Sequence, residues 1–208
     1  MRRQLVPALR MVLVLTVLLG LAYPLVGTLV AQGLFRAKAD GSLVKVNGQV
    51  VGSEQLGQGF TEAKYFQGRP SAAGITASGS LDDQGKAGDP SDPSEMNSGG
   101  SNLGPTNPTL LDDVSQRVAA YRKENHLSAS TPVPVDAVTS SGSGVDPDIS
   151  VANARLQAAR VAGARGLPVS KVDALIDQYT TGRSLGFLGD PGVNVLELNL
   201  ALDRITGS

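Results

Sequence analysis

One serine of this sequence stands in a pattern that hydrolases use for their nucleophile. The run Gly182-Arg183-Ser184-Leu185-Gly186 matches the G-x-S-x-G elbow, which requires a strand before it, a helix after it and a histidine further along the chain. Here a helical pattern precedes the serine and a glycine-broken loop follows it. The only histidine, His126, lies upstream. The sequence therefore predicts that Ser184 is a turn residue in an exposed loop.

Three other features could carry chemistry, and each is incomplete. Gly142-Ser143-Gly144 is half of a dinucleotide fingerprint, but Pro147 and the lack of a strand–turn–helix frame argue against a nucleotide loop there. Asp146 and Asp148 form an acid pair, yet a calcium loop needs more oxygen ligands in register. His126 is expected at the end of a helix, where the helix dipole favours it as a surface residue. We predict no catalytic constellation and no metal site.

The composition excludes several further classes of protein. The 208 residues contain no cysteine, so disulfides, thiolate zinc sites, iron–sulfur clusters and a cysteine nucleophile are excluded. The formal net charge is −1, which does not suggest nucleic acid as a partner. Only 4% of the residues are aromatic.

The first secondary-structure element that the sequence predicts is an apolar helix near the N-terminus. Residues 11–35 carry no charge and would form a helix of roughly 38 Å, against about 30 Å of hydrocarbon in a bilayer. A cleaved signal peptide would have a shorter apolar stretch of about 7–15 residues. We therefore predict a retained transmembrane helix over 11–35, with a cleaved signal as the alternative.

Charges around this run predict its orientation. Three arginines precede it and two basic residues follow it: Arg2, Arg3, Arg10, Arg36 and Lys38. The positive-inside rule then puts residues 1–10 in the cytoplasm and residues 36–208 outside. Within the run, Gly20, Gly27 and Ala31 fall near one helical face, and small residues on one face allow a partner helix to pack closely.

The rest of the chain predicts one small α+β domain with a β-hairpin and about three helices. Asn47-Gly48 between two short apolar runs is typical of a hairpin with a type I′ turn. Residues 76–109 are rich in Gly, Ser, Asp and Pro and are expected to form a flexible loop. We predict helices over 109–125, capped by Thr109, over 150–165, capped by Ser150, and over 170–179, capped by Ser170. The alternation in 193–202 favours a strand with a bulge at Leu196-Glu197.

A series of short motifs carries a resemblance to a known family. They follow one another along nearly the whole chain, from Gly41-Ser42-Leu43 to Glu197-Leu198-Asn199-Leu200-Ala201-Leu202-Asp203. Their order and spacing resemble the C subunit of the bacterial high-affinity potassium-transporting P-type ATPase, the Kdp complex. The residues that carry the likeness include Tyr65, Phe66, Gly68, Arg69, Pro70, Ser71, Ser101, Asn102, Asn107, Pro108, Ser143, Gly144, Asp146 and Asn199.

The resemblance implies a non-catalytic accessory subunit in the bacterial cytoplasmic (inner) membrane. Its implied partners are a potassium-channel-like subunit, a P-type ATP-hydrolysing subunit, a small peptide subunit and the lipid bilayer. The family's C subunit is described as a catalytic chaperone that raises the pump's affinity for ATP, with no tightly bound cofactor and ATP shared transiently. The family's glutamine-based nucleotide proposal would fall on Gln157. The alternatives are a membrane-anchored extracytoplasmic hydrolase using Ser184 or an acid pair, and a stand-alone binding module.

Overall fold

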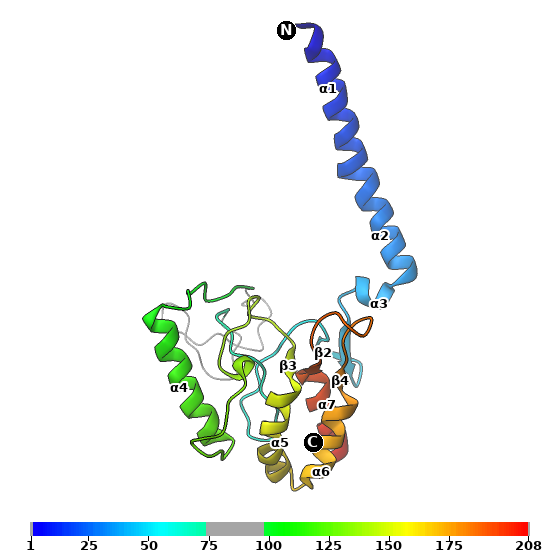
Figure 1. Ribbon diagram of the computed structural model, residues 1–208. Helices are drawn as coiled ribbons and strands as arrows, with labels where there is room; N and C mark the ends of the chain where they lie inside the picture. The colour runs from blue at the N-terminus through cyan, green and yellow to red at the C-terminus, as the bar shows by residue number, and fades with distance from the viewer. Residues whose placement is uncertain (1, 74–97, 208) are drawn as a thin grey trace. The chain divides into compact units, whose positions relative to one another are not determined.

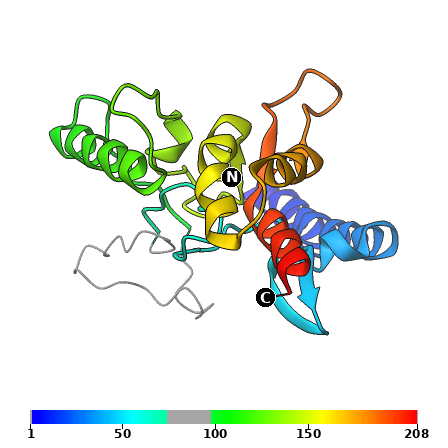
Figure 2. The same cartoon turned by 90° about the horizontal axis from the view of Figure 1, so that it is seen from below.

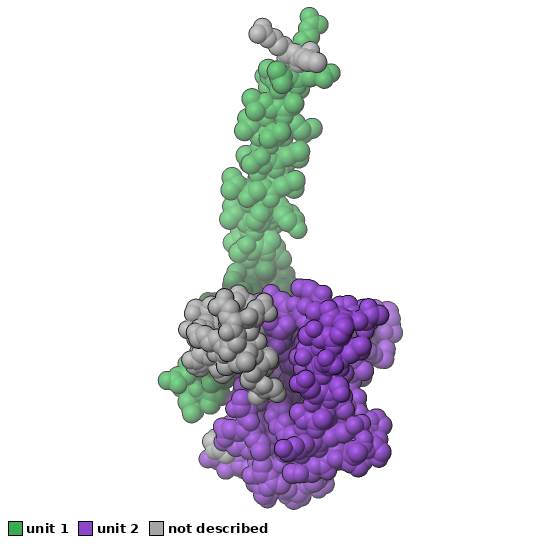
Figure 3. Space-filling model, turned by 90° about the vertical axis from the view of Figure 1, so that its left-hand side faces the viewer, with its two compact units in different colours: residues 1–53 green, residues 54–208 purple. Residues whose placement is uncertain are grey.

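The computed structural model describes residues 2–73 and 98–207 of the chain (Figure 1). Most of the predicted loop at 76–109 lies outside these residues. The described chain forms two compact units, residues 1–53 and residues 54–208, which are coloured separately in Figure 3. Each unit is considered by itself below.

The first unit begins with one long apolar helix. It runs through α1 (Arg2–Val17), a π-helical turn η1 (Leu18–Ala22) and α2 (Tyr23–Leu34). Arg3–Leu34 is long and apolar enough to cross a membrane, and none of its most apolar window is buried. Pro24 cannot donate a hydrogen bond, and the π-turn just before it lets the Tyr23 N–H reach the Leu18 carbonyl instead.

A short helix and a hairpin complete this unit. Helix α3 (Arg36–Ala39) leads into β1 (Leu43–Val46) and β2 (Gln49–Ser53), which pair antiparallel. Asn47 and Gly48 have φ angles of 51° and 81°, as a type I′ turn requires. The predicted hairpin is confirmed.

The described part of the second unit packs four α-helices with a small sheet. The helices are α4 (Pro108–Glu124), α5 (Val151–Arg165), α6 (Val169–Gln178) and α7 (Val195–Thr206), and a 3-10 turn, η3 (Val135–Ala137), precedes α5. Strands β3 (Asp148–Ser150), β5 (Gly192–Asn194) and β4 (Thr180–Thr181) form an antiparallel sheet in that order. In Figures 1 and 2, α5 lies between α4 on one side and the pair α6 and α7 on the other.

The core of this unit lies between α5, α6, α7 and the sheet. Its apolar members include Phe66, Ile149, Val161, Val172, Ile176, Val193, Leu198 and Leu202, each no more than 2% exposed. Phe66 is the one member of this set that belongs to neither a helix nor a strand. The α+β class is therefore confirmed, with one more long helix in the described chain than the sequence predicts.

The predicted strand over 193–202 is wrong, because only its first residues are extended. Val195 starts α7, and Asn194 caps it by accepting a hydrogen bond from the Glu197 N–H at 3.1 Å. Val195, Leu198 and Leu202 are buried at helical spacing. The break in the alternation at Leu196-Glu197 thus reflects the spacing of buried residues in a helix and not a β-bulge.

Two of the three predicted helix caps are also wrong. Asn107 caps α4 in place of Thr109, since its side chain accepts from the Thr109 N–H at 2.9 Å and Pro108 occupies the first turn. Helix α6 begins at Val169 after Pro168, one residue before Ser170. Ser150 does cap α5, accepting from the Asn153 N–H at 3.1 Å.

Candidate functional site

A cavity of about 330 Å³ opens beside the segment that carries the motif residues 65–71. This segment, residues 63–71, has no helix or strand of its own. The cavity walls come from the segment, from α4 and from α5, and include Gln67, Arg69, Ser71, Arg117, Tyr121, Glu124, Asn153 and Gln157.

Side chains of two helices hydrogen-bond the backbone of this segment, as a neighbouring strand would do in a β-sheet. Five consecutive carbonyls, those of residues 63–67, each accept a hydrogen bond from a helix side chain. The donors on α5 are Gln157, Arg160 and Arg165, and the donor on α7 is Asn199. Buried backbone groups must be paired, so these side chains allow an irregular segment to lie inside the unit.

Two carboxamides hold adjacent residues of the segment in the same way. Asn199 accepts from the Phe66 N–H at 2.8 Å and donates to the Phe66 carbonyl at 2.9 Å. Gln157 accepts from the Gln67 N–H at 2.8 Å and donates to the Gln67 carbonyl at 3.1 Å. Both carboxamides are 1% exposed. Residues 66 and 67 are thus fixed between α5 and α7, and we call this arrangement the carboxamide clamp.

The Gln157 amide has no hydrogen-bonding capacity left. Its oxygen also accepts from Arg160 Nη2 at 2.8 Å, and its nitrogen also donates to Asn153 Oδ1 at 2.9 Å. A carboxamide offers two N–H groups and two lone pairs, and all four are used inside the protein. A ligand could contact this amide only after one of these bonds breaks.

A buried polar network surrounds the clamp. The Arg160 guanidinium, in a residue only 6% exposed, donates to Asn125 Oδ1 at 2.9 Å and to the carbonyls of Ala63 and Tyr65. Burial lowers the pKa of Arg160, and the nearby Glu124 carboxylate opposes this effect. The Tyr121 hydroxyl donates to Asn153 Oδ1 at 2.8 Å, and burial raises its pKa well above the usual value. The network therefore joins α4 to α5 through polar side chains.

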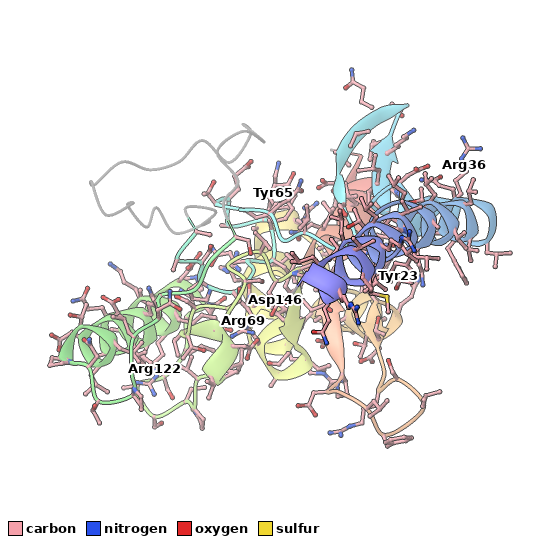
Figure 4. The ribbon with its side chains drawn as sticks, turned by 90° about the horizontal axis from the view of Figure 1, so that it is seen from above. Tyr23, Arg36, Tyr65, Arg69, Arg122 and Asp146 are labelled. Atoms are coloured by element: carbon pink, nitrogen blue, oxygen red, sulfur yellow. The ribbon has the colours of Figure 1, made fainter. Side chains whose placement is uncertain are left out.

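The segment continues into a cluster of loops that gathers further motif residues. Arg69 Nη1 bonds Asp146 Oδ2 at 2.9 Å, and Figure 4 labels both side chains. Ser141 N–H donates to the Pro70 carbonyl at 3.1 Å. A Cβ on Gly144, which has a φ of +72°, would lie 2.6 Å from both Ala73 Cβ and the Gly99 carbonyl oxygen. The motif residues 69–71 and 143–146 thus meet in space because the loops pack closely.

The remaining motif residues have local roles or exposed positions. Tyr65 donates its hydroxyl to Asp203 Oδ2 at 3.2 Å, and Arg165 lies over the Tyr65 ring at 5.0 Å. Ser101 and Asn102 are exposed in the stretch before α4.

The candidates for catalysis do not come together. Ser184 is exposed in the loop between β4 and β5, where its N–H and carbonyl pair with Leu188. His126 is exposed at the end of α4. Asp146 Oδ1 accepts from the Asp148 N–H at 3.1 Å, so the acid pair closes a turn. Within residues 2–73 and 98–207, no three acidic or histidine side chains are grouped to hold a metal ion.

Sequence reasoning named Gln157, Asn199 and Phe66 but missed the side chains that surround the clamp. Arg160 and Arg165 on α5 look like ordinary surface charges in an alanine-rich helix, and Asn153 looks like a first-turn residue. Asp136 was missed as well, although it accepts from Ser150 N–H and Ser150 Oγ, both at 2.8 Å. The available signal was the polar residues on the same face of α5 at helical spacing, namely 153, 157 and 160.

In the part of the chain that the structure describes, one helix is long and apolar enough to cross a membrane, and an α+β unit follows it. This arrangement is typical of a membrane-anchored protein. Comparison with known proteins identifies the type. Residues 5–204 match the family model KdpC, described as K+-transporting ATPase, c chain. The chain belongs to this family.

Curated relatives carry the same description. The chain is 56% identical over 205 residues to the potassium-transporting ATPase KdpC subunit of Mycobacterium tuberculosis (strain ATCC 25618 / H37Rv), covering 99% of this chain and 100% of the relative. It is 52% identical to the subunit of that name from Caulobacter vibrioides, over 95% of this chain and 91% of the relative. For Paraburkholderia phytofirmans the identity is 50%, over 92% of each chain. The resemblance read from the motifs is confirmed, and these relatives are accessory subunits of an ATPase complex rather than its catalysts.

Proposed function

We propose that this chain assembles and stabilises an ATP-driven potassium uptake pump. Its partners would be a potassium-channel-like subunit, a P-type ATP-hydrolysing subunit and a small peptide subunit. The family match over residues 5–204 supports this assignment. The proposal places the chain in the bacterial cytoplasmic membrane, with residues 1–10 inside and residues 36–208 outside, because basic residues are concentrated before the apolar helix.

The proposal includes a catalytic-chaperone role in which the chain raises the affinity of the pump for ATP without contacting the nucleotide. The observation that carries this indirect mode is the Gln157 amide, whose four hydrogen bonds are all made inside the protein. Binding of the chain to one conformation of the pump would shift the pump toward that conformation, and this shift would change the affinity of the ATP site. In the direct alternative, Gln157 contacts a nucleotide shared with the pump, at the cost of opening the clamp.

Orientation can be tested by site-specific labelling, because the natural chain has no cysteine. Arg3→Cys and Val135→Cys each place one thiol at an exposed position, one before and one after the uncharged run 11–35. With intact spheroplasts and a membrane-impermeant maleimide, Val135→Cys should react and Arg3→Cys should react only after lysis. The reverse pattern would contradict the proposed orientation.

The chaperone role is tested with the other subunits purified with and without this chain. Potassium-stimulated ATP hydrolysis should show a higher KM for ATP in its absence. A photoreactive ATP analogue bound to the whole complex should label the ATP-hydrolysing subunit and leave this chain unlabelled. Labelling of this chain near Gln157 would favour the direct alternative.

We further propose that the face of Gly20, Gly27 and Ala31 packs against a partner helix in the membrane. A side chain at Gly27 would meet nothing within 4 Å in the chain itself, and the same holds for Gly33 on another face. Gly27→Leu should therefore reduce co-purification of the partners, while Gly33→Leu serves as the matched control. Equal losses in both variants would argue against a specific face.

A further inference from the structure

The hairpin after the apolar helix exposes apolar residues in a way that an isolated hairpin cannot sustain in water. Leu43 is 51% exposed and Val50 is 53% exposed. None of the apolar residues of β1 and β2 is buried. A lone two-stranded hairpin is marginally stable at best, so this one needs a surface to cover it.

Two of the three exposed apolar residues of the hairpin, Leu43 and Val50, share one face, although the register is irregular between Val44 and Lys45. Lys45 pairs with Val50 across the hairpin, and paired residues point to the same side. Leu43 is two residues from Lys45 on the same strand, so it shares this side as well. The face thus presents two aliphatic side chains with a lysine between them, which we call the hairpin face.

The surroundings of the hairpin face in its own unit indicate what covers it. The hairpin belongs to the same compact unit as the apolar helix, and only eight residues lie between Leu34 and Leu43. Helix α3 turns back toward the end of α2, since Gln32 Nε2 donates to Asp40 Oδ1 at 3.0 Å. Residues 36–53 are therefore held next to the end of the membrane-spanning segment.

Charge separates this stretch from the rest of the chain. Residues 36–53 contain three basic residues, Arg36, Lys38 and Lys45, and one acidic residue, Asp40. Residues 54–208 contain 12 basic and 18 acidic residues. An anionic surface would thus attract the stretch beside the span and repel the second unit.

We propose that residues 36–53 bind the anionic lipid headgroups around the span. In this arrangement Leu43 and Val50 enter the boundary between headgroups and acyl chains. Lys45, Arg36 and Lys38 lie at the lipid phosphates, as basic residues beside apolar ones do in interfacial elements. The inference concerns this chain and the bilayer, and it stands apart from any effect on ATP affinity.

The natural chain has no tryptophan, so a single introduced tryptophan reports its own surroundings. The test uses the full chain in nanodiscs that contain phosphatidylcholine alone or with phosphatidylglycerol, with brominated acyl chains as quencher. Val50→Trp probes the hairpin face, and Val135→Trp, at a residue that is 72% exposed in the second unit, is the matched control.

We expect brominated lipid to quench Val50→Trp and to leave Val135→Trp unquenched, with stronger quenching in phosphatidylglycerol. Adding Lys45→Glu to Val50→Trp should weaken partition about fivefold for each unit of charge in the anionic nanodiscs and have little effect in phosphatidylcholine. Quenching by aqueous iodide that is equal for both tryptophans, with none from brominated lipid, would overturn the proposal. Protection of Val50→Trp only when the other pump subunits are present would overturn it too, because a protein would then cover the face.

Discussion

Replacing Gln157 with leucine should destabilise the second unit by removing half of the carboxamide clamp. The substitution removes four hydrogen bonds and leaves three groups without a partner: the Gln67 N–H, the Gln67 carbonyl and one N–H of Arg160. Asn153 Oδ1 keeps its bond from the Tyr121 hydroxyl at 2.8 Å.

The magnitude follows from these three groups. A buried polar group that loses its partner costs about 1–3 kcal/mol, and the Gln67 groups are only partly buried, so about 3–6 kcal/mol is lost in total. A buried leucine returns about 1.5–2 kcal/mol of that loss. The net loss is about 1–4.5 kcal/mol, which is a substantial part of the roughly 5–15 kcal/mol that stabilises a typical domain.

The assay is urea unfolding of the full chain in detergent, followed by far-ultraviolet circular dichroism. Gln178→Leu is the control, because Gln178 is exposed at the end of α6 and such substitutions change stability by at most about 0.5 kcal/mol. Hydrogen exchange offers a local readout, since a loss of about 2.8 kcal/mol would speed exchange of the Gln67 amide roughly a hundredfold. If the two variants unfold at the same urea concentration with the same slope, the clamp does not hold the segment and the reasoning is refuted.

Three further predictions concern other parts of the second unit. Gly144→Ala should destabilise this unit, because the new Cβ would clash with Ala73 and the Gly99 carbonyl at a residue with a positive φ. Gly163→Ala inside α5 meets nothing within 4 Å and should stabilise the unit by about 0.5–1 kcal/mol. Thermal unfolding that ranks the two variants the other way would contradict the packing argument. Ser184→Ala should leave the potassium-stimulated ATPase activity of the whole complex unchanged, and a loss of activity would revive the hydrolase alternative. Burial, with a smaller contribution from the Asp146 charge, raises the pKa of Asp148, so the folded state binds this proton more readily and stability falls as pH rises through that pKa. Asp148→Asn should therefore be more stable than the parent at pH 7 and lose this advantage near pH 3, and a gain that is equal at both values would show that the charge is not its cause.

Local patterns in the sequence were sufficient to predict the elements that neighbouring residues determine. Asn47-Gly48 requires two positive φ angles, and the structure has them. The Ser150 cap and the left-handed Gly166 that ends α5 follow from the same kind of rule. The apolar run needs no tertiary partner to be recognised, since its length alone matches a bilayer.

The error in 193–202 shows where local patterns fail. A short apolar run with one phase slip fits both a bulged strand and an amphipathic helix. Burial of Leu198 and Leu202 against the core decided for the helix, and so did the capping bond from Glu197 N–H to Asn194. The contacts that bury Leu198 and Leu202 come from residues distant in the sequence, whereas the capping bond is local and supports the same helix.

Local patterns and ordered motifs are enough to assign the apolar helix, the hairpin and the family membership. The role of the motif around Phe66 depends instead on contacts between distant parts of the chain. Phe66 and Gln67 are held by Asn199 and Gln157, which lie 133 and 90 residues further along the chain. A side chain that hydrogen-bonds a distant backbone group produces no periodic pattern in the sequence around it. Its partner depends on how the elements pack and not on the spacing of residues along the chain.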